Sequence, residues 1–235
     1  MVARKKRNIT RRRKRGGGQP TSPTFHVVIG TAGRPSLKGM IDSLKSELQA
    51  GDGLTILFDG KKAKAKSGYT DDWLAGVPFA VKTIEQVPGL KYYGHPLLNK
   101  YIPTISPKTT YMMFADDDDS YISGSFDKLR LLCTDPEILY ITKMNYANNL
   151  AQIIPKSETT QIEESNIGKP NGIIPFRDAG KSEFGYKKNG NNKYYKGDFD
   201  YYNNLKDKVK GIVFLDTIIY TVGSDQGNAA NGNTE

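Results

Sequence analysis

The sequence predicts an α/β domain in which helices flank a mostly parallel central sheet. Two apolar runs rich in β-branched residues, Phe25-His-Val-Val-Ile29 and Leu54-Thr-Ile-Leu-Phe58, are separated by a stretch with helical spacing. A strand, a helix and a strand of these lengths are typical of a parallel pair joined by a right-handed crossover. A third apolar run, residues 111–115, reads as another buried strand and ends in four consecutive aspartates.

The first helix is predicted from its boundaries and its spacing. The turn Gly30-Thr-Ala-Gly-Arg-Pro35 leads into it, and a proline suits the first helical turn because its missing N–H is not needed there. Apolar residues then recur at helical intervals until Gly51 and Gly53 end the pattern. The apolar positions are Leu37, Met40, Ile41, Leu44 and Leu48. The strand that follows ends at Asp59-Gly60.

The middle of the chain shows weaker patterns. Residues 61–68 are expected to form a lysine-containing loop, and residues 73–86 to contain a helix interrupted by Pro78. Residues 90–93 are interpreted as a short strand. A helix is expected over residues 95–105, because its apolar residues fall on one side.

The C-terminal half is predicted to hold two further helices, residues 126–133 and 200–208, and two strands, residues 138–142 and 211–222. Between them, residues 145–195 are rich in Asn, Gly, Lys and Tyr and show little regular pattern, except that residues 166–175 are typical of a turn leading into a short extended segment. Loops of this length within a compact domain are usually functional or mobile.

The net charge of +9 is concentrated at the N-terminus. Nine cations lie between Arg4 and Arg15 with no acid among them, so 34 − 9 = 25 basic residues remain against 25 acidic ones. The rest of the chain is therefore neutral, and contact with a polyanion is expected of this arm alone. Residues 1–23 are expected to be a disordered basic arm, residues 24–222 one folded domain and residues 223–235 a polar tail.

Several protein classes are disfavoured by composition. No apolar run is long enough to cross a membrane, and the basic N-terminus lacks the apolar segment of a secretory signal. Cys133 is the only cysteine of the 235 residues, which excludes an internal disulfide. These features favour a cytoplasmic protein, in the host cytoplasm if the source is a virus.

Four adjacent carboxylates, Asp116 to Asp119, repel one another at the end of a buried strand unless a positive group lies among them. A divalent cation is the usual partner, because hard cations prefer carboxylate oxygens, whereas the alternative is a solvated acidic turn. In α/β sheets ligands bind beyond the carboxyl ends of strands, and residues 31–34 and Asp59 follow two further ends. The phosphate-loop motif is absent and the dinucleotide glycine motif is incomplete. The pattern thus predicts a nucleotide-diphosphate site with a metal ion.

Four stretches in order resemble the GT-A-fold glycosyltransferases, most of all glycosyltransferase family 2 and small related transferases of bacteria and large DNA viruses. Residues 27–37 resemble the family's first strand and its Pro-Thr-x-Asn-Arg-Pro turn. Residues 54–60 resemble its second strand, and Phe114-Ala-Asp-Asp-Asp-Asp119 resembles its Asp-x-Asp motif. Gly197-Asp-Phe-Asp-Tyr-Tyr202, followed by a helix and a strand, resembles the segment that carries the catalytic base. The resemblance implies a GT-A-like, Rossmann-like single domain.

The resemblance also implies roles for the matched residues of the donor site. Thr31, Ala32 and Arg34 would line the nucleotide pocket. Asp59 would accept a hydrogen bond from the base or the ribose.

The aspartates of the other two motifs would bind the ribose, the metal and the acceptor proton. Asp116 or Asp117 would bind the ribose, depending on how the motif is registered, and Asp118 would hold Mn²⁺ or Mg²⁺ against the diphosphate. Asp198 would be the general base, with Asp200 as the alternative.

The sequence departs from the family pattern at several positions. Gly30 and Gly33 replace the common Pro and Asn, and Asp59-Gly60 lacks the usual second acid. The base segment lacks the common Glu-Asp pair.

His95, beside a proline, is interpreted as a surface or packing residue.

The predicted function is metal-dependent transfer of a hexosyl or deoxyhexosyl group from a UDP-, GDP- or dTDP-linked donor to a hydroxyl of a glycan or glycoprotein, with inversion implied by the resemblance. Two alternatives stay open. A metal-dependent nucleotidyltransferase also uses acids at strand ends. A nucleic-acid-associated structural protein would act through its basic arm.

Overall fold

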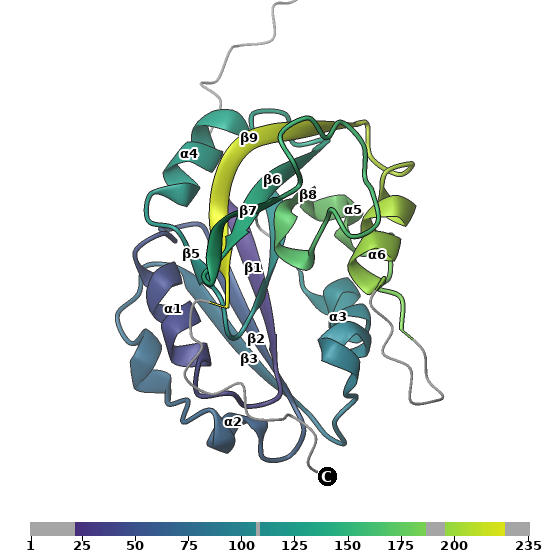
Figure 1. Ribbon diagram of the computed structural model, residues 1–235. Helices are drawn as coiled ribbons and strands as arrows, with labels where there is room; N and C mark the ends of the chain where they lie inside the picture. The colour runs from purple at the N-terminus through teal and green to yellow at the C-terminus, as the bar shows by residue number, and fades with distance from the viewer. Residues whose placement is uncertain (1–21, 107–108, 187–195, 224–235) are drawn as a thin grey trace, which may run out of the picture.

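A computed structural model of the chain describes residues 22–106, 109–186 and 196–223, and all structural statements refer to these. One sheet of nine strands organises the domain, in the order β3-β2-β1-β4-β8-β6-β9-β5, with β7 paired to β6. Helices cover both faces of this sheet, and β9 curves strongly across one end of it (Figure 1). Most of the predicted arm and tail therefore lie outside the described residues.

The parallel half of the sheet is the part that the sequence predicts best. Strands β1 (Phe25–Thr31), β2 (Gly53–Asp59), β3 (Ala80–Gln86) and β4 (Tyr111–Asp116) all run in one direction. β1 lies between β2 and β4, so its apolar residues are buried on both faces. The predicted strand–helix–strand unit is confirmed.

The other half of the sheet is mixed. Its strands are β5 (Ser120–Tyr121), β6 (Ile138–Tyr146), β7 (Asn149–Ile154), β8 (Gly172–Pro175) and β9 (Gly211–Val222). β8 runs antiparallel to both β4 and β6, whereas β6 and β9 are parallel. The α/β fold class is confirmed, and the central sheet is mixed and curled.

Two apolar cores lie on opposite faces of the sheet. One joins the sheet to α1 (Leu37–Lys45) and α4 (Ser125–Leu132), and the other to α3 (His95–Tyr101) and α6 (Gly197–Leu205). The remaining helical turns are α2 (Ala63–Lys66), α5 (Phe176–Ala179), η1 (Asp71–Leu74), η2 (Tyr92–Gly94), η3 (Ile102–Thr104) and η4 (Lys169–Asn171). No described helix is both long and apolar enough to span a bilayer.

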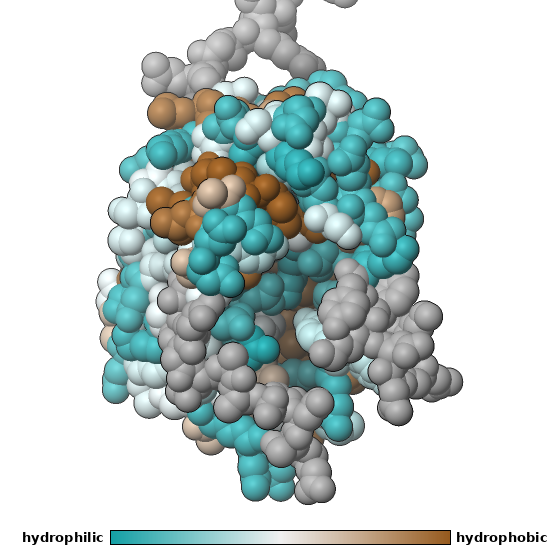
Figure 2. Space-filling view, viewed as in Figure 1, coloured by the Kyte–Doolittle hydropathy of each residue, from teal (hydrophilic) through white to brown (hydrophobic). Residues whose placement is uncertain are grey.

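The outer surface is polar over most of the face drawn in Figure 2. Apolar side chains gather on it in the region of β6, β7 and β9, and hydrophilic ones surround the lower part of the sheet (Figure 2). Leu150 on β7 and Val213 on β9 are among the exposed large apolar residues.

Two predictions for the less regular stretches are wrong. Residues 80–86 form the edge strand β3 and not a helix, because pairing with β2 outweighs a weak local pattern. Residues 92–94 form a helical turn and not a strand. Within residues 145–195, the short extended segment expected at the end of residues 166–175 is confirmed as β8, whereas β7 was not predicted.

A buried ion pair ties the start of β2 to α4. Asp52 accepts hydrogen bonds from the backbone N–H groups of Phe25 (2.8 Å) and Gln49 (2.9 Å), and Arg130 Nη2 lies 2.5 Å from its second oxygen. The Asp52 side chain is fully buried and that of Arg130 is 8% exposed. This aspartate, directly before β2, therefore joins β1, the loop after α1 and α4.

Replacing Asp52 with Ala should lower the free energy of unfolding by about 3–5 kcal/mol, because it leaves a buried guanidinium without its counter-charge. Asp127→Ala is the matched control, since Asp127 lies 3.3 Å from the same guanidinium but is 85% exposed. It should cost less than about 1 kcal/mol. Urea denaturation of both variants measures the difference, and equal losses would contradict the assignment.

Candidate active site

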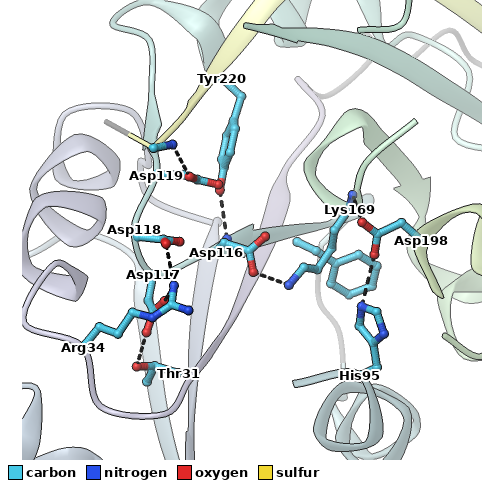
Figure 3. A network of polar contacts seen from close by, with 12 residues as sticks. Thr31, Arg34, His95, Asp116, Asp117, Asp118, Asp119, Lys169, Asp198 and Tyr220 are labelled. Atoms are coloured by element: carbon cyan, nitrogen blue, oxygen red, sulfur yellow. Dashed lines mark hydrogen bonds and ion pairs between the residues drawn. The ribbon is translucent and has the colours of Figure 1, made fainter. Parts of the chain in front are cut away.

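The turn after β1 is fastened to the acid run after β4. Thr31 Oγ1 donates a hydrogen bond of 2.5 Å to Asp117 and accepts one of 2.9 Å from the backbone N–H of Gly33. Arg34 Nη1 lies 3.2 Å from Asp117 and 2.5 Å from Asp118 (Figure 3). Gly33 has a φ of +98°, and a Cβ there would lie 2.5 Å from the carbonyl oxygen of Ala63. The glycine found in place of the family's Asn is thus required by the close approach of α2.

The end of β9 holds the other side of the acid run. The backbone N–H of Gly223 donates to Asp119 (2.7 Å), and the backbone N–H of Asp116 donates to the hydroxyl of Tyr220 (2.8 Å). Tyr220 is fully buried. The last strand therefore fixes where the four carboxylates sit, although it is more than a hundred residues away in the sequence.

The four carboxylates alternate between buried and open positions. Residues Asp117 and Asp119 are each 4% exposed, whereas the side chains of Asp116 and Asp118 are 36% and 40% exposed. Burial raises the pKa of Asp117 to about 6, against the opposing effects of Arg34 and Thr31. Burial, followed by the charge of Asp116, raises the pKa of Asp119 to about 7. Asp117 and Asp119 are thus part of the scaffold, and Asp116 and Asp118 face the solvent.

A buried lysine connects the acid run to the predicted base segment. Lys169 is 5% exposed; its Nζ contacts the carboxylate of Asp116 and its backbone N–H donates to Asp198 (3.0 Å) (Figure 3). Burial lowers the pKa of Lys169, but the charges of Asp116 and Asp198 outweigh it and hold the pKa above its usual value. Sequence reasoning missed this residue, and its only signal was the Gly-Lys-Pro turn before a short apolar stretch.

His95 contacts the same aspartate from α3. Its Nε2 lies 3.2 Å from Asp198 Oδ1, and its ring stacks on Phe184 with 5.2 Å between centroids. The interpretation of His95 as a surface or packing residue accounts for the stack on Phe184 but not for the contact with Asp198. Burial would raise the pKa of Asp198, but the contact with His95 and the charge of Lys169 outweigh it and lower the pKa.

The remaining predicted residues lie around this centre. Ala32 is exposed in the turn after β1. Asp59 ends β2, where its two oxygens accept the backbone N–H groups of Leu90 (2.5 Å) and Lys91 (2.7 Å). Asp200 lies in the first turn of α6 and is partly buried. The structure thus brings the turn after β1, the acid run and Asp198 together, and it engages Asp59 with a neighbouring loop.

Few side chains of the described residues are placed to bind a metal ion. Within the described parts of the chain, no three His, Cys, Asp or Glu side chains converge on one point to hold a metal ion. Asp118 is nevertheless an open carboxylate, and Asp116 lies two residues away on the same open side. Mg²⁺ is commonly held by one or two carboxylates, with substrate phosphates and waters as its other ligands. These residues fit a cation that shares its coordination with a diphosphate.

No protein-family model and no curated protein matches the sequence. Solved structures match the fold. TarS from S. aureus has a TM-score of 0.62 at 13% identity over 84% of this chain and 60% of that one. Its complex with UDP-GlcNAc has a TM-score of 0.62 at 13% identity, over 88% of this chain and 61% of that one. A third match is mannosyltransferase PcManGT from Pyrobaculum calidifontis in complex with GDP-Man and Mn²⁺. Its TM-score is 0.60 at 9% identity, over 86% of this chain and 57% of that one.

The chain has the GT-A glycosyltransferase fold. It spans about 60% of the length of each of these structures. The resemblance inferred from four short motifs is therefore confirmed at the level of the fold.

Thr31→Val should lower the free energy of unfolding by about 1–3 kcal/mol, because Asp117 and the Gly33 N–H both lose a buried partner. Thr109→Val is the control, since the buried Thr109 hydroxyl has no hydrogen-bond partner among the described residues. That change should be neutral or stabilising. Thermal or urea unfolding distinguishes the two variants, and equal destabilisation would argue against the Thr31 contact.

Proposed function

We propose that this protein is a glycosyltransferase that moves a sugar from a nucleotide-diphosphate donor to an acceptor hydroxyl. The observation that carries the proposal is the placement of two open carboxylates, Asp116 and Asp118, beside Arg34 on one side and Asp198 on the other, with Lys169 between. The end with Asp118 and Arg34 suits a diphosphate, and the end with Asp198 offers a general base.

In the proposed donor site, Thr31, Ala32 and Arg34 line the nucleotide pocket. Asp116 binds the ribose in preference to Asp117, because Asp117 is buried and occupied by Thr31. Asp59 retains lone pairs for the base after its two backbone hydrogen bonds.

Asp118 would hold Mn²⁺ or Mg²⁺ in this site, and the bound cation would stabilise the charge of the leaving diphosphate as a Lewis acid. The Arg34 guanidinium, already beside Asp118, supplies a second positive charge to that position.

In the proposed acceptor site, Asp198 removes the proton of the attacking hydroxyl. The new glycosidic bond forms as the bond between the anomeric carbon and the phosphate oxygen breaks, and the nucleoside diphosphate leaves with the electron pair. Attack from the face opposite the leaving group inverts the anomeric centre. Asp198 is favoured over Asp200 because Lys169 ties it directly to the acid run.

The proposal extends to the substrates. The donor is a UDP-, GDP- or dTDP-linked hexose or deoxyhexose, and the acceptor is a hydroxyl of a glycan or glycoprotein, in the cytoplasm. Contact of the basic arm with a polyanion is a separate activity that the donor site does not need.

One of UDP, GDP and dTDP should bind in the presence of Mn²⁺ and lose affinity in EDTA, as measured by calorimetric titration. Asp118→Ala should weaken that binding more than about tenfold. Asp42→Ala is the control, since Asp42 is an equally exposed aspartate (48%) with a lysine at 2.5 Å, on α1. It should bind like the wild type.

The same titration has outcomes that contradict the proposal. A folded protein that binds none of the three diphosphates is not a nucleotide-sugar transferase. If EDTA leaves diphosphate binding unchanged, only the proposed metal requirement is contradicted. Release of pyrophosphate from a nucleoside triphosphate and a sugar phosphate would instead identify a nucleotidyltransferase.

Asp198→Asn should reduce kcat for donor hydrolysis, with water as the acceptor, by about 10²–10⁴-fold, because the amide cannot accept the proton. The affinity for the diphosphate should not change. Asp200→Asn is the matched control two residues along the same helix, and it should retain most activity. The opposite order of effects would assign the base to Asp200.

A further inference from the structure

The residue before Asp198 leaves room for a histidine. Where the resembled family has a Glu-Asp pair, this chain has Gly197-Asp198. A Cβ on Gly197 would lie 2.3 Å from His95 Nδ1 and 2.6 Å from the carbonyl oxygen of Gly185. The imidazole thus fills the space that any side chain at position 197 would need.

The His95 ring is held between two acceptors. Nδ1 lies 3.1 Å from the carbonyl oxygen of Gly185. Nε2 lies 3.2 Å from Asp198 Oδ1, which is an ion-pair distance, and this buried oxygen has no hydrogen-bond partner among the described residues. A neutral imidazole carries one N–H, so only a ring protonated on both nitrogens donates toward both acceptors. The geometry therefore matches an imidazolium paired with a carboxylate.

The segment behind the ring is fixed to the same helix. Asn99 donates to the carbonyl oxygen of Phe184 (2.9 Å) and accepts from its backbone N–H (2.7 Å). Phe184 in turn stacks on Tyr201 of α6, with 4.3 Å between centroids. The histidine and the aspartate are thus positioned by one packed unit of α3, α6 and residues 184–185.

We propose that His95 is the positioning residue of the base, and that its protonated ring orients the Asp198 carboxylate toward the acceptor and keeps it an anion. This inference rests on the proposed role of Asp198. His95 would not touch the acceptor or the donor, and it would act through the carboxylate alone.

The charges around Asp198 determine what removal of His95 would do. Lys169 faces it from η4, and Asp116 of β4 lies on the far side of that lysine. Asp200 and Lys196 belong to its own helix or the residue before it. Without His95, burial is opposed by a single lysine that Asp116 shares, so the pKa of Asp198 should rise.

The kinetic test uses hydrolysis of UDP-GlcNAc and GDP-mannose by the full chain. His95→Phe keeps a ring to stack on Phe184 but has no N–H, and His95→Gln keeps an N–H without the charge. In His95→Phe, kcat at neutral pH should fall about tenfold or more with the donor KM unchanged. Because the base must be ionised, the acid limb of the pH–rate profile should move up by about one pH unit or more. His95→Gln should recover part of the rate.

A purely structural role would give a different result. It would lower the rate by the same factor at every pH, and this outcome, like an unchanged rate, overturns the inference. Circular dichroism checks the fold, and His95→Gln serves the test if His95→Phe does not fold.

A second test needs no activity. The chain has two histidines, so ¹⁵N spectra of the imidazoles contain His95 and, as an internal reference, His26. The ¹⁵N signals of both His95 nitrogens should shift in Asp198→Asn, because the ring loses its charged partner, while those of His26 stay unchanged. If the protein hydrolyses the donor but Asp198→Asn does not change the His95 signal, the inference about His95 is overturned and the proposed function is not. A wild type without hydrolysis overturns the proposed function instead.

Discussion

The residue on which the site depends is Lys169, whose buried ammonium pairs with Asp116 and whose backbone N–H donates to Asp198. It joins the end of a central strand to the start of a helix on one face of the sheet. A buried cation is costly unless it is paired, so Asp116 cannot be lost without penalty. The open acid run and the base candidate are held at a defined separation for this reason, and β8, which follows the lysine directly, locks the arrangement into the sheet.

The same principle explains how the chain tolerates four adjacent aspartates. Their repulsion is relieved partly by protein groups: Arg34 lies on Asp117 and Asp118, Lys169 on Asp116, and a backbone N–H on Asp119. The sequence argument assigned this task to a divalent cation. The proposed cation would bind at Asp118, a 40% exposed side chain whose partner is an exposed arginine that a diphosphate can share.

The departures from the family pattern have local physical reasons. Gly33 allows the turn after β1 to pass against α2, and Gly197 allows the His95 ring to reach the base candidate. In both places the glycine removes a Cβ where another group comes within 3 Å. The substitutions therefore accompany specific contacts, and in the segment of Asp198 the space of the missing side chain is taken by His95 from another helix.

The sequence by itself determined β1, α1, β2 and β4 of the parallel half and the place of the acid run, because apolar periodicity over short windows reports burial of consecutive residues. It also identified the turn after β1, Asp59 and both candidate bases. It could not locate β3, an edge strand with little burial, or choose between Asp116 and Asp117 as the open carboxylate. Lys169 gave only the weak signal of its Gly-Lys-Pro turn, and nothing local linked His95 to Asp198, since the partners of both residues are distant in sequence. Tertiary structure alone decided these, because a buried charge is placed by its partner and not by its neighbours in the chain.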